Sequence, residues 1–472
     1  MRSVVRAAKF VCLLVILLIA AAGLWLTLMP PELLRVGSGY AAKMVCSNVF
    51  IAGRNPDEVL AVDVQAPGNP LLKLMRVSVD REARRVHAGF FWLLGGNEAV
   101  YREGLGCTVR PDGKAPPAIG VAPVVAAAGD PDGADLLWPE GQKVFPNESV
   151  MTVLSDPALT GPGMRAVVVV KGGRVVGEAY GEGFSASTPL IGWSMTKTVN
   201  AAIIGTLIRD GRMALADRDL VAAWRGSARA TITLANLLAM ESGLEFNEDY
   251  GTVADVTRML FLESDMARFV ADKPLVSAPG SAFNYSSGTS TLVSKLWMEA
   301  IGTRSGGRTA ALSYPRRALF DPIGMKSAVM ETDAEGTFVG SSYLYATARD
   351  WARFGLLLSH DGVWNGNRIL PEGFVALMQT PNGHSGGRFT QMQTWLPSRD
   401  GAVKGRMPPD TFYLSGHDGQ TVAVMPSLDL VVVRMGLTPG YGNYDPGFLA
   451  GTLAAMPAGA LTGMLNATAV GR

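Results

Sequence analysis

A serine and a lysine three residues apart, Ser194 and Lys197, open an apolar run whose helical spacing continues to Gly211. Residues three apart share one helical face, so this spacing predicts a helix that presents both side chains together near its amino-terminal end. A serine hydroxyl is a weak nucleophile until a base removes its proton, and a desolvated lysine with a lowered pKa is such a base. Many chains of this length contain Ser-x-x-Lys by chance, so the hypothesis needs further residues.

Two later segments supply groups that such a nucleophile requires. Residues 279–288 read Pro-Gly-Ser-Ala-Phe-Asn-Tyr-Ser-Ser-Gly and place Tyr285 in a turn, before an apolar run near Thr289 that predicts a helix. Residues 416–420 read Gly-His-Asp-Gly-Gln and precede two strand-like runs between 421 and 435.

The order of the predicted elements constrains the fold. Two strands joined by a Gly-Gly turn are predicted within 166–176, and apolar helical patterns dominate from 201 to about 355. Strands return from 412 to 436. This order indicates a sheet assembled from both ends of a domain, with a helical region inserted between its halves.

Taken in order, the three segments resemble the motifs Ser-x-x-Lys, Tyr-x-Asn and Lys-Thr-Gly of the serine β-lactamase and penicillin-binding protein superfamily, class C type. Here the second motif reads Tyr285-Ser286-Ser287 and the third His417-Asp418-Gly419. These variants are most similar to the esterase and 6-aminohexanoate-dimer hydrolase branch. The resemblance covers about residues 150–460 and implies an α/β (α+β) fold, in which helices and an inserted all-helical subdomain flank an antiparallel β-lactamase-like sheet.

The resemblance also implies a role for each position. Ser194 is the acylated nucleophile, Lys197 takes its proton directly or through Tyr285, and Tyr285 protonates the leaving group before water hydrolyses the acyl-enzyme. The backbone N–H groups of Ser194 and Gln420 are expected to bind the oxyanion. The residues expected to bind substrate are Trp193, Ser287, His417 and Gly419. An acidic turn, 245–250, could overhang the site, although such turns are more often solvated.

The motifs favour hydrolysis of a small ester or linear amide. The lysine of Lys-Thr-Gly recognises a substrate carboxylate, so its absence argues against a true lactamase and lowers the case for a D-Ala-D-Ala peptidase. A cell-wall D-Ala-D-Ala peptidase or muropeptide amidase remains the alternative. A non-catalytic penicillin-binding-like protein is a weaker alternative, because Ser194, Lys197 and Tyr285 are all present.

The amino-terminal segment combines Arg2, Arg6 and Lys9 with a charge-free stretch, residues 10–29, that is long enough to cross a bilayer as a helix. By the positive-inside rule, the body would lie on the periplasmic or extracellular side. We interpret the segment as a membrane anchor. The alternative is a signal sequence cleaved near Ala20–Ala22, which would release a secreted or periplasmic protein.

The chain is predicted to have four parts: residues 1–30 as anchor or signal segment, 31–115 as a small extracytoplasmic module, 116–150 as a linker and 151–472 as the hydrolase domain. The module contains short strand-like runs such as 59–64. Cys46 and Cys107 are the only cysteines beyond the apolar segment, and in an oxidising compartment we expect them to pair. Two separate buried thiols are the alternative.

Composition excludes several classes of function. Forty-two basic and 41 acidic residues give a net charge of +1, which offers no electrostatic reason to expect nucleic acid. The four histidines, at 87, 360, 384 and 417, show no metal-ligand spacing, so no metal is expected, and the expected acyl-serine mechanism needs no organic cofactor. The sequence around the serine, Gly-Trp-Ser-Met-Thr, lacks the Gly-x-Ser-x-Gly signature of α/β-hydrolases.

Overall fold

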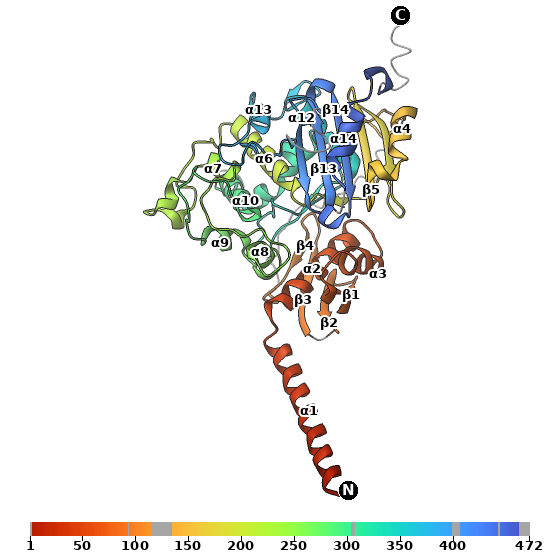
Figure 1. Cartoon of the computed structure of the whole chain (residues 1–472). Coiled ribbons are helices and arrows are strands. Elements are labelled where there is room, and N and C mark those ends of the chain that lie inside the picture. Colours follow the sequence, from red (N-terminus) through yellow and green to blue (C-terminus); the bar gives the residue numbers. More distant parts are fainter. Residues whose placement is uncertain are drawn as a thin grey trace, which may run out of the picture.

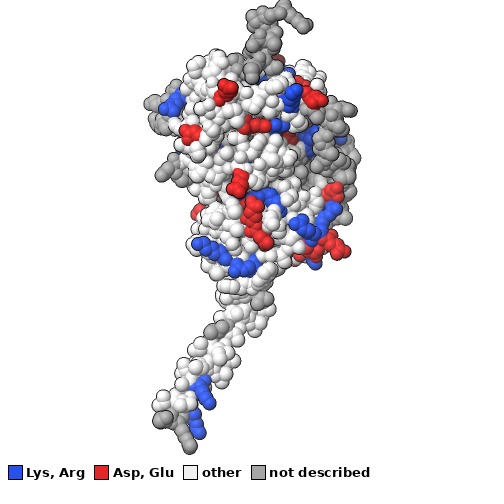
Figure 2. All heavy atoms as spheres, turned by 90° about the vertical axis from the view of Figure 1, so that its right-hand side faces the viewer, with Lys and Arg blue, Asp and Glu red and all other residues white. Residues whose placement is uncertain are grey.

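The computed structural model describes residues 2–92, 94–114, 135–303, 307–398, 406–441 and 444–461. Figure 1 shows a single extended helix, a small module and a large domain, in that order along the molecule. The helix is α1 (Arg2–Leu28), and no part of its apolar stretch, Val4–Leu28, is buried against the protein. Among the described residues it is the one helix long and apolar enough to cross a membrane. In the view of Figure 2 its basic residues lie near its free end.

The large domain is built around a five-stranded antiparallel sheet. Its order is β12 (Phe412–Gly416), β13 (Gln420–Met425), β14 (Leu430–Gly436), β5 (Met164–Lys171) and β6 (Arg174–Tyr180). The two ends of the domain therefore meet at the β14–β5 pair, as the sequence predicted.

Both faces of this sheet are covered, which explains its continuous runs of valine. Val168 and Val170 of β5 face the main core with α12 (Ala348–Ser359), whereas Val167 and Val169 face a second core. The second core is closed by α4 (Glu148–Leu154), α5 (Pro157–Thr160) and α14 (Pro446–Ala454).

Helices fill most of the chain between the two halves of the sheet. They are α6 (Met195–Arg209), α7 (Leu234–Leu238), α8 (Asp255–Leu262), α9 (Met266–Ala271), α10 (Ser287–Gly302) and α11 (Gly307–Pro315), followed later by α13 (Phe374–Gln379). Short strands also occur here: β7 (Leu190–Ile191), β8 (Val329–Met330) and β9 (Leu344–Ala346) form one small sheet, and β10 (Val363–Trp364) pairs with β11 (Asn367–Arg368). Strands of two or three residues are too short to show a periodicity, so the sequence did not predict them.

The amino-terminal module consists of α2 (Glu32–Phe50) packed across a four-stranded antiparallel sheet, β1 (Met75–Asp80), β2 (Arg85–Phe90), β3 (Leu94–Arg102) and β4 (Gly106–Val109). The strand predicted at 59–64 is wrong. After the short α3 (Pro56–Glu58), Val59–Gln65 form a π-helical turn that buries Val59, Asp63 and Val64 on one side. Most of the predicted linker lies in 115–134, outside the described residues.

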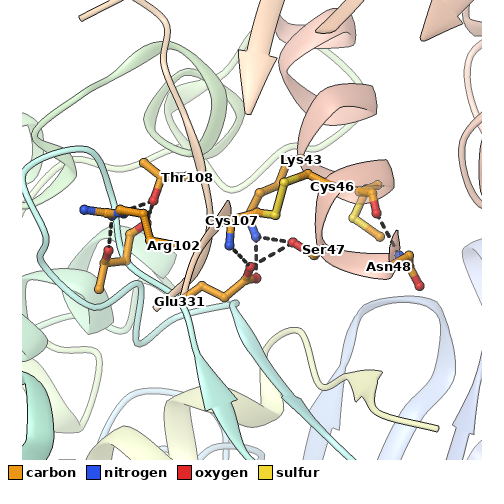
Figure 3. The surroundings of a disulfide bond; sticks show 10 residues. Lys43, Cys46, Ser47, Asn48, Arg102, Cys107, Thr108 and Glu331 are labelled. Atoms are coloured by element: carbon orange, nitrogen blue, oxygen red, sulfur yellow. Dashed lines mark hydrogen bonds and ion pairs between the residues drawn. A yellow bond between two sulfur atoms is a disulfide. The ribbon is translucent and has the colours of Figure 1, made fainter. Parts of the chain in front are cut away.

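A disulfide and a buried ion pair hold the module together and dock it on the large domain (Figure 3). Cys46 of α2 is bonded to Cys107 of β4, as predicted. Beside it, the carboxylate of Glu331, a residue of the large domain, is ion-paired with Lys43 and accepts hydrogen bonds from Ser47 Oγ (2.8 Å) and the Cys107 N–H (2.6 Å). Both charged side chains are buried, so this contact fixes how the two parts meet.

Candidate active site

The candidate nucleophile stands where a sharp turn enters α6. Trp193 adopts a left-handed conformation (φ +47°), which is unusual for a bulky residue, and Ser194 follows as the first residue before the helix. Gly416, at the end of β12, faces this turn: a Cβ there would come within 2.2 Å of the Gly192 carbonyl oxygen. Only glycine allows this approach, which brings the end of β12 beside the candidate nucleophile.

Lys197 lies one helical turn after Ser194 and is fully buried. Its Nζ is 3.0 Å from Ser194 Oγ, 3.0 Å from Ser287 Oγ and 3.1 Å from the Ser341 carbonyl oxygen. An ammonium would donate to all three. A neutral amine would donate to two of them and accept the Ser194 proton with its lone pair, which is the arrangement of a base.

Burial lowers the pKa of Lys197 to about 8, because desolvation penalises its charged form, while the nearby Glu248 carboxylate acts in the opposite direction. A lysine with this pKa is partly neutral near physiological pH. The electrostatic setting therefore suits proton removal from Ser194.

Glu248 links to the same cluster through Ser287. Its carboxylate accepts hydrogen bonds from the Ser287 N–H (2.8 Å) and the Ser287 hydroxyl, and burial raises its pKa. Ser287 thus bridges Glu248 and Lys197. Sequence reasoning favoured a solvated acidic turn at 245–250, and for Glu248 this was wrong. Glu248 and Ser287 are 39 residues apart in the chain, and no local sequence pattern indicates that they are in contact.

Tyr285 lies beside the lysine. Lys197 Nζ is 4.7 Å from the centroid of the Tyr285 ring, which also packs against Phe389 and Trp395 with centroid distances of 5.6 and 5.3 Å. These aromatic neighbours fix the ring next to the Ser194–Lys197 pair. The structure thus places the Tyr285 ring beside Lys197, and its proton-transfer role stays a prediction.

The predicted substrate residues His417 and Trp193 belong to a group of three rings. His417 stacks on Tyr250 (centroids 5.1 Å apart) and meets the edge of Trp193 (5.8 Å). Tyr250 forms side-chain hydrogen bonds with Ser287 and Ser342, which lower its pKa. Burial has the larger effect, so the pKa of Tyr250 is raised well above the usual value for tyrosine. The three rings therefore adjoin the Ser287–Lys197 cluster.

The expected oxyanion donors lie on the elements that converge here. Within the described part of the chain, the Ser194 N–H donates to no protein acceptor. Gln420 is the first residue of β13 and pairs with Gly416. Its side-chain Oε1 accepts a hydrogen bond from the Gly436 N–H (2.8 Å). Gly419 has a left-handed backbone (φ +85°), and a Cβ there would lie 2.6 Å from Arg434 Nη1, so the local structure already favours glycine there. Contact of Gly419 with substrate stays a prediction.

Groups of three or more His, Cys, Asp or Glu side chains that could hold a metal ion are not found among the residues that the structure describes.

The chain belongs to the Beta-lactamase family, whose model matches residues 157–445. It is therefore a hydrolase with the β-lactamase fold. Among curated proteins it is similar to the 6-aminohexanoate-dimer hydrolase of Paenarthrobacter ureafaciens, with 25% identity over 300 residues that cover 58% of this chain and 72% of the relative.

Solved structures show the same fold. EstCE1, described as a hydrolase with promiscuous acyltransferase activity, is 16% identical, with a TM-score of 0.51, over 65% of this chain and 97% of that one. A family VIII carboxylesterase is 15% identical, with a TM-score of 0.50, over 67% of this chain and 99% of that one. The family model begins at residue 157, so α1 and the amino-terminal module lie outside it.

Proposed function

We propose that this protein is a serine hydrolase that cleaves a small ester or linear amide through an acyl-enzyme on Ser194. The observation that carries the proposal is the 3.0 Å contact between Ser194 Oγ and the buried amine of Lys197. Lys197 acts as the general base, and Tyr285 protonates the leaving group. Water then attacks the acyl-enzyme, and the carboxylic acid is released.

The oxyanion would bind to the backbone N–H groups of Ser194 and Gln420, and His417, Ser287 and Trp193 would contact the substrate. The similarity to a 6-aminohexanoate-dimer hydrolase supports amides as candidate substrates, and the esterase structures share the fold.

We further propose that α1 anchors the enzyme in a membrane with the body on the periplasmic or extracellular side. The apolar stretch Val4–Leu28 supports a span by its length and composition, and the alternative is a cleaved signal sequence. A mass measurement of the mature amino terminus separates the two.

The test is hydrolysis of p-nitrophenyl butyrate by the full chain in detergent. Ser194→Ala should reduce the rate by at least about a hundredfold. Tyr285→Phe is the matched variant, because it keeps the ring that packs on Phe389 and Trp395 and removes only the hydroxyl. Equal rates for Ser194→Ala and the unmodified protein would refute the proposal. Activity confined to a D-Ala-D-Ala peptide would favour the cell-wall peptidase.

A further inference from the structure

A cavity of about 360 Å³ lies between the amino-terminal module and the large domain. From the module it is lined by residues that include Val36, Leu72 and Phe90, and from the domain by residues that include Trp193, Tyr250 and His417. Its volume is in the range of small-molecule sites in proteins. The module that forms one side of it lies outside the matched family model, so part of this cavity comes from residues that the family model does not cover.

The domain end of the cavity adjoins the proposed nucleophile. Trp193 immediately precedes Ser194, and Tyr250 belongs to both places: its ring lines the cavity, and it interacts with Ser287, which bonds Lys197. The cavity and the Ser194–Lys197 cluster therefore adjoin at Trp193 and Tyr250.

The carboxylate and imidazole groups that line this cavity both come from the domain side, which also contributes Phe261 and Pro439. Side chains from α2, the segment before β1 and β2 contribute mainly hydrocarbon surface, whereas the domain end offers the imidazole of His417 and the carboxylate of Asp418. This distribution matches an amphiphile whose polar carbonyl end lies near Ser194 and whose hydrocarbon tail lies against the module.

The apolar end also lies close to the proposed membrane segment. Leu33, which lines the cavity, follows Leu28, the last residue of α1, by five residues, so at most about 18 Å of chain separates them. The module, with β3, lies at the carboxy-terminal end of α1 (Figure 1). The turn before β3 exposes Phe91 and Trp92 by 55% and 54%, and aromatic side chains of this kind are enriched where a protein meets a bilayer surface.

We infer that the esters cleaved at Ser194 extend beyond small ones to long-chain acyl esters dissolved in the membrane, and that the cavity binds their acyl chain. This inference rests on the proposed function. Ser194 Oγ attacks the carbonyl carbon, the bond to the alcohol oxygen breaks, and the alcohol leaves with a proton. Water then cleaves the acyl-serine ester and releases a fatty acid. The module selects for the chain because it shields the chain from water while the carbonyl lies at Ser194, and each methylene exposed to water there instead would weaken binding by about fourfold.

The test uses the full chain in phosphatidylcholine vesicles with p-nitrophenyl butyrate and p-nitrophenyl laurate. Leu33→Glu places a carboxylate at the cavity. Val62→Glu is its matched control: Leu33 and Val62 are 42% and 43% exposed on the same module, but Val62 does not line the cavity. Both positions tolerate a polar side chain because both reach solvent.

We expect the unmodified protein to prefer laurate by about tenfold or more in kcat/KM. Leu33→Glu should lower kcat/KM for the laurate ester about tenfold and leave kcat/KM for the butyrate ester within about twofold of the unmodified protein. The retained butyrate activity also shows that the variant is folded. Val62→Glu should change neither. Equal kcat/KM for both esters, or equal losses in the two variants, would overturn the inference. Butyrate turnover that survives Ser194→Ala would instead refute the proposed function, so the two failures are distinguishable.

Discussion

The pH dependence of hydrolysis tests the central arrangement most directly. Lys197 accepts the Ser194 proton only when its amine is neutral, and burial lowers its pKa to about 8. Two units below that pKa about one amine in a hundred is neutral, and at the pKa about one in two. We therefore predict that kcat/KM rises about fiftyfold from pH 6 to pH 8 and levels off above pH 9.

The assay follows p-nitrophenyl butyrate hydrolysis at an isosbestic wavelength of p-nitrophenol, so that ionisation of the product does not distort the rates. Spontaneous hydrolysis, measured with Ser194→Ala at each pH, is subtracted. His417→Asn is a further control, because it removes the imidazole beside Tyr250 and leaves Lys197 in place, so the rise should persist. A flat profile between pH 6 and 8, or a midpoint near the ordinary lysine value of about 10.4, would refute the assignment of Lys197 as a desolvated base.

Two further predictions follow from buried charges. Glu248→Gln should move the midpoint of the pH profile to lower pH, because the Glu248 carboxylate raises the pKa of Lys197; an unchanged or higher midpoint, measured in the same assay, would contradict this coupling. Glu331→Gln should lower the free energy of unfolding by about 3–5 kcal/mol, since it removes the carboxylate that balances the charge of the buried Lys43 amine. Thermal unfolding of the full chain in detergent measures this loss. Adding Lys43→Met should restore most of it, and a double variant no more stable than Glu331→Gln would count against the explanation.

The sequence predicted the parts of this protein that depend on local pattern. The Ser-x-x-Lys spacing placed both groups on one helical face, and strand-like runs at the two ends of the domain indicated a sheet assembled from both. The charge-free stretch at residues 10–29 indicated an apolar helix. Each of these conclusions uses residues that are close in the chain, where helical or strand geometry alone fixes which side chains are neighbours.

Local pattern was misleading where packing decided the conformation. The run 59–64 is rich in β-branched residues, yet it forms a π-helical turn because Val59, Asp63 and Val64 are buried together against the module. Likewise Glu248 lies in a segment whose composition is typical of a solvated turn.

The tertiary structure alone decided what surrounds Lys197 and what borders the site. Ser287, Ser341 and Glu248 come from segments far from α6, and only the packing of α10 and the loops against it brings them to the lysine. The cavity depends on docking of the module through the ion pair between Lys43 and Glu331, which are 288 residues apart in the chain. A sequence pattern reports periodicity along the chain, whereas a site formed between distant segments depends on how buried surfaces and charges fit together in space.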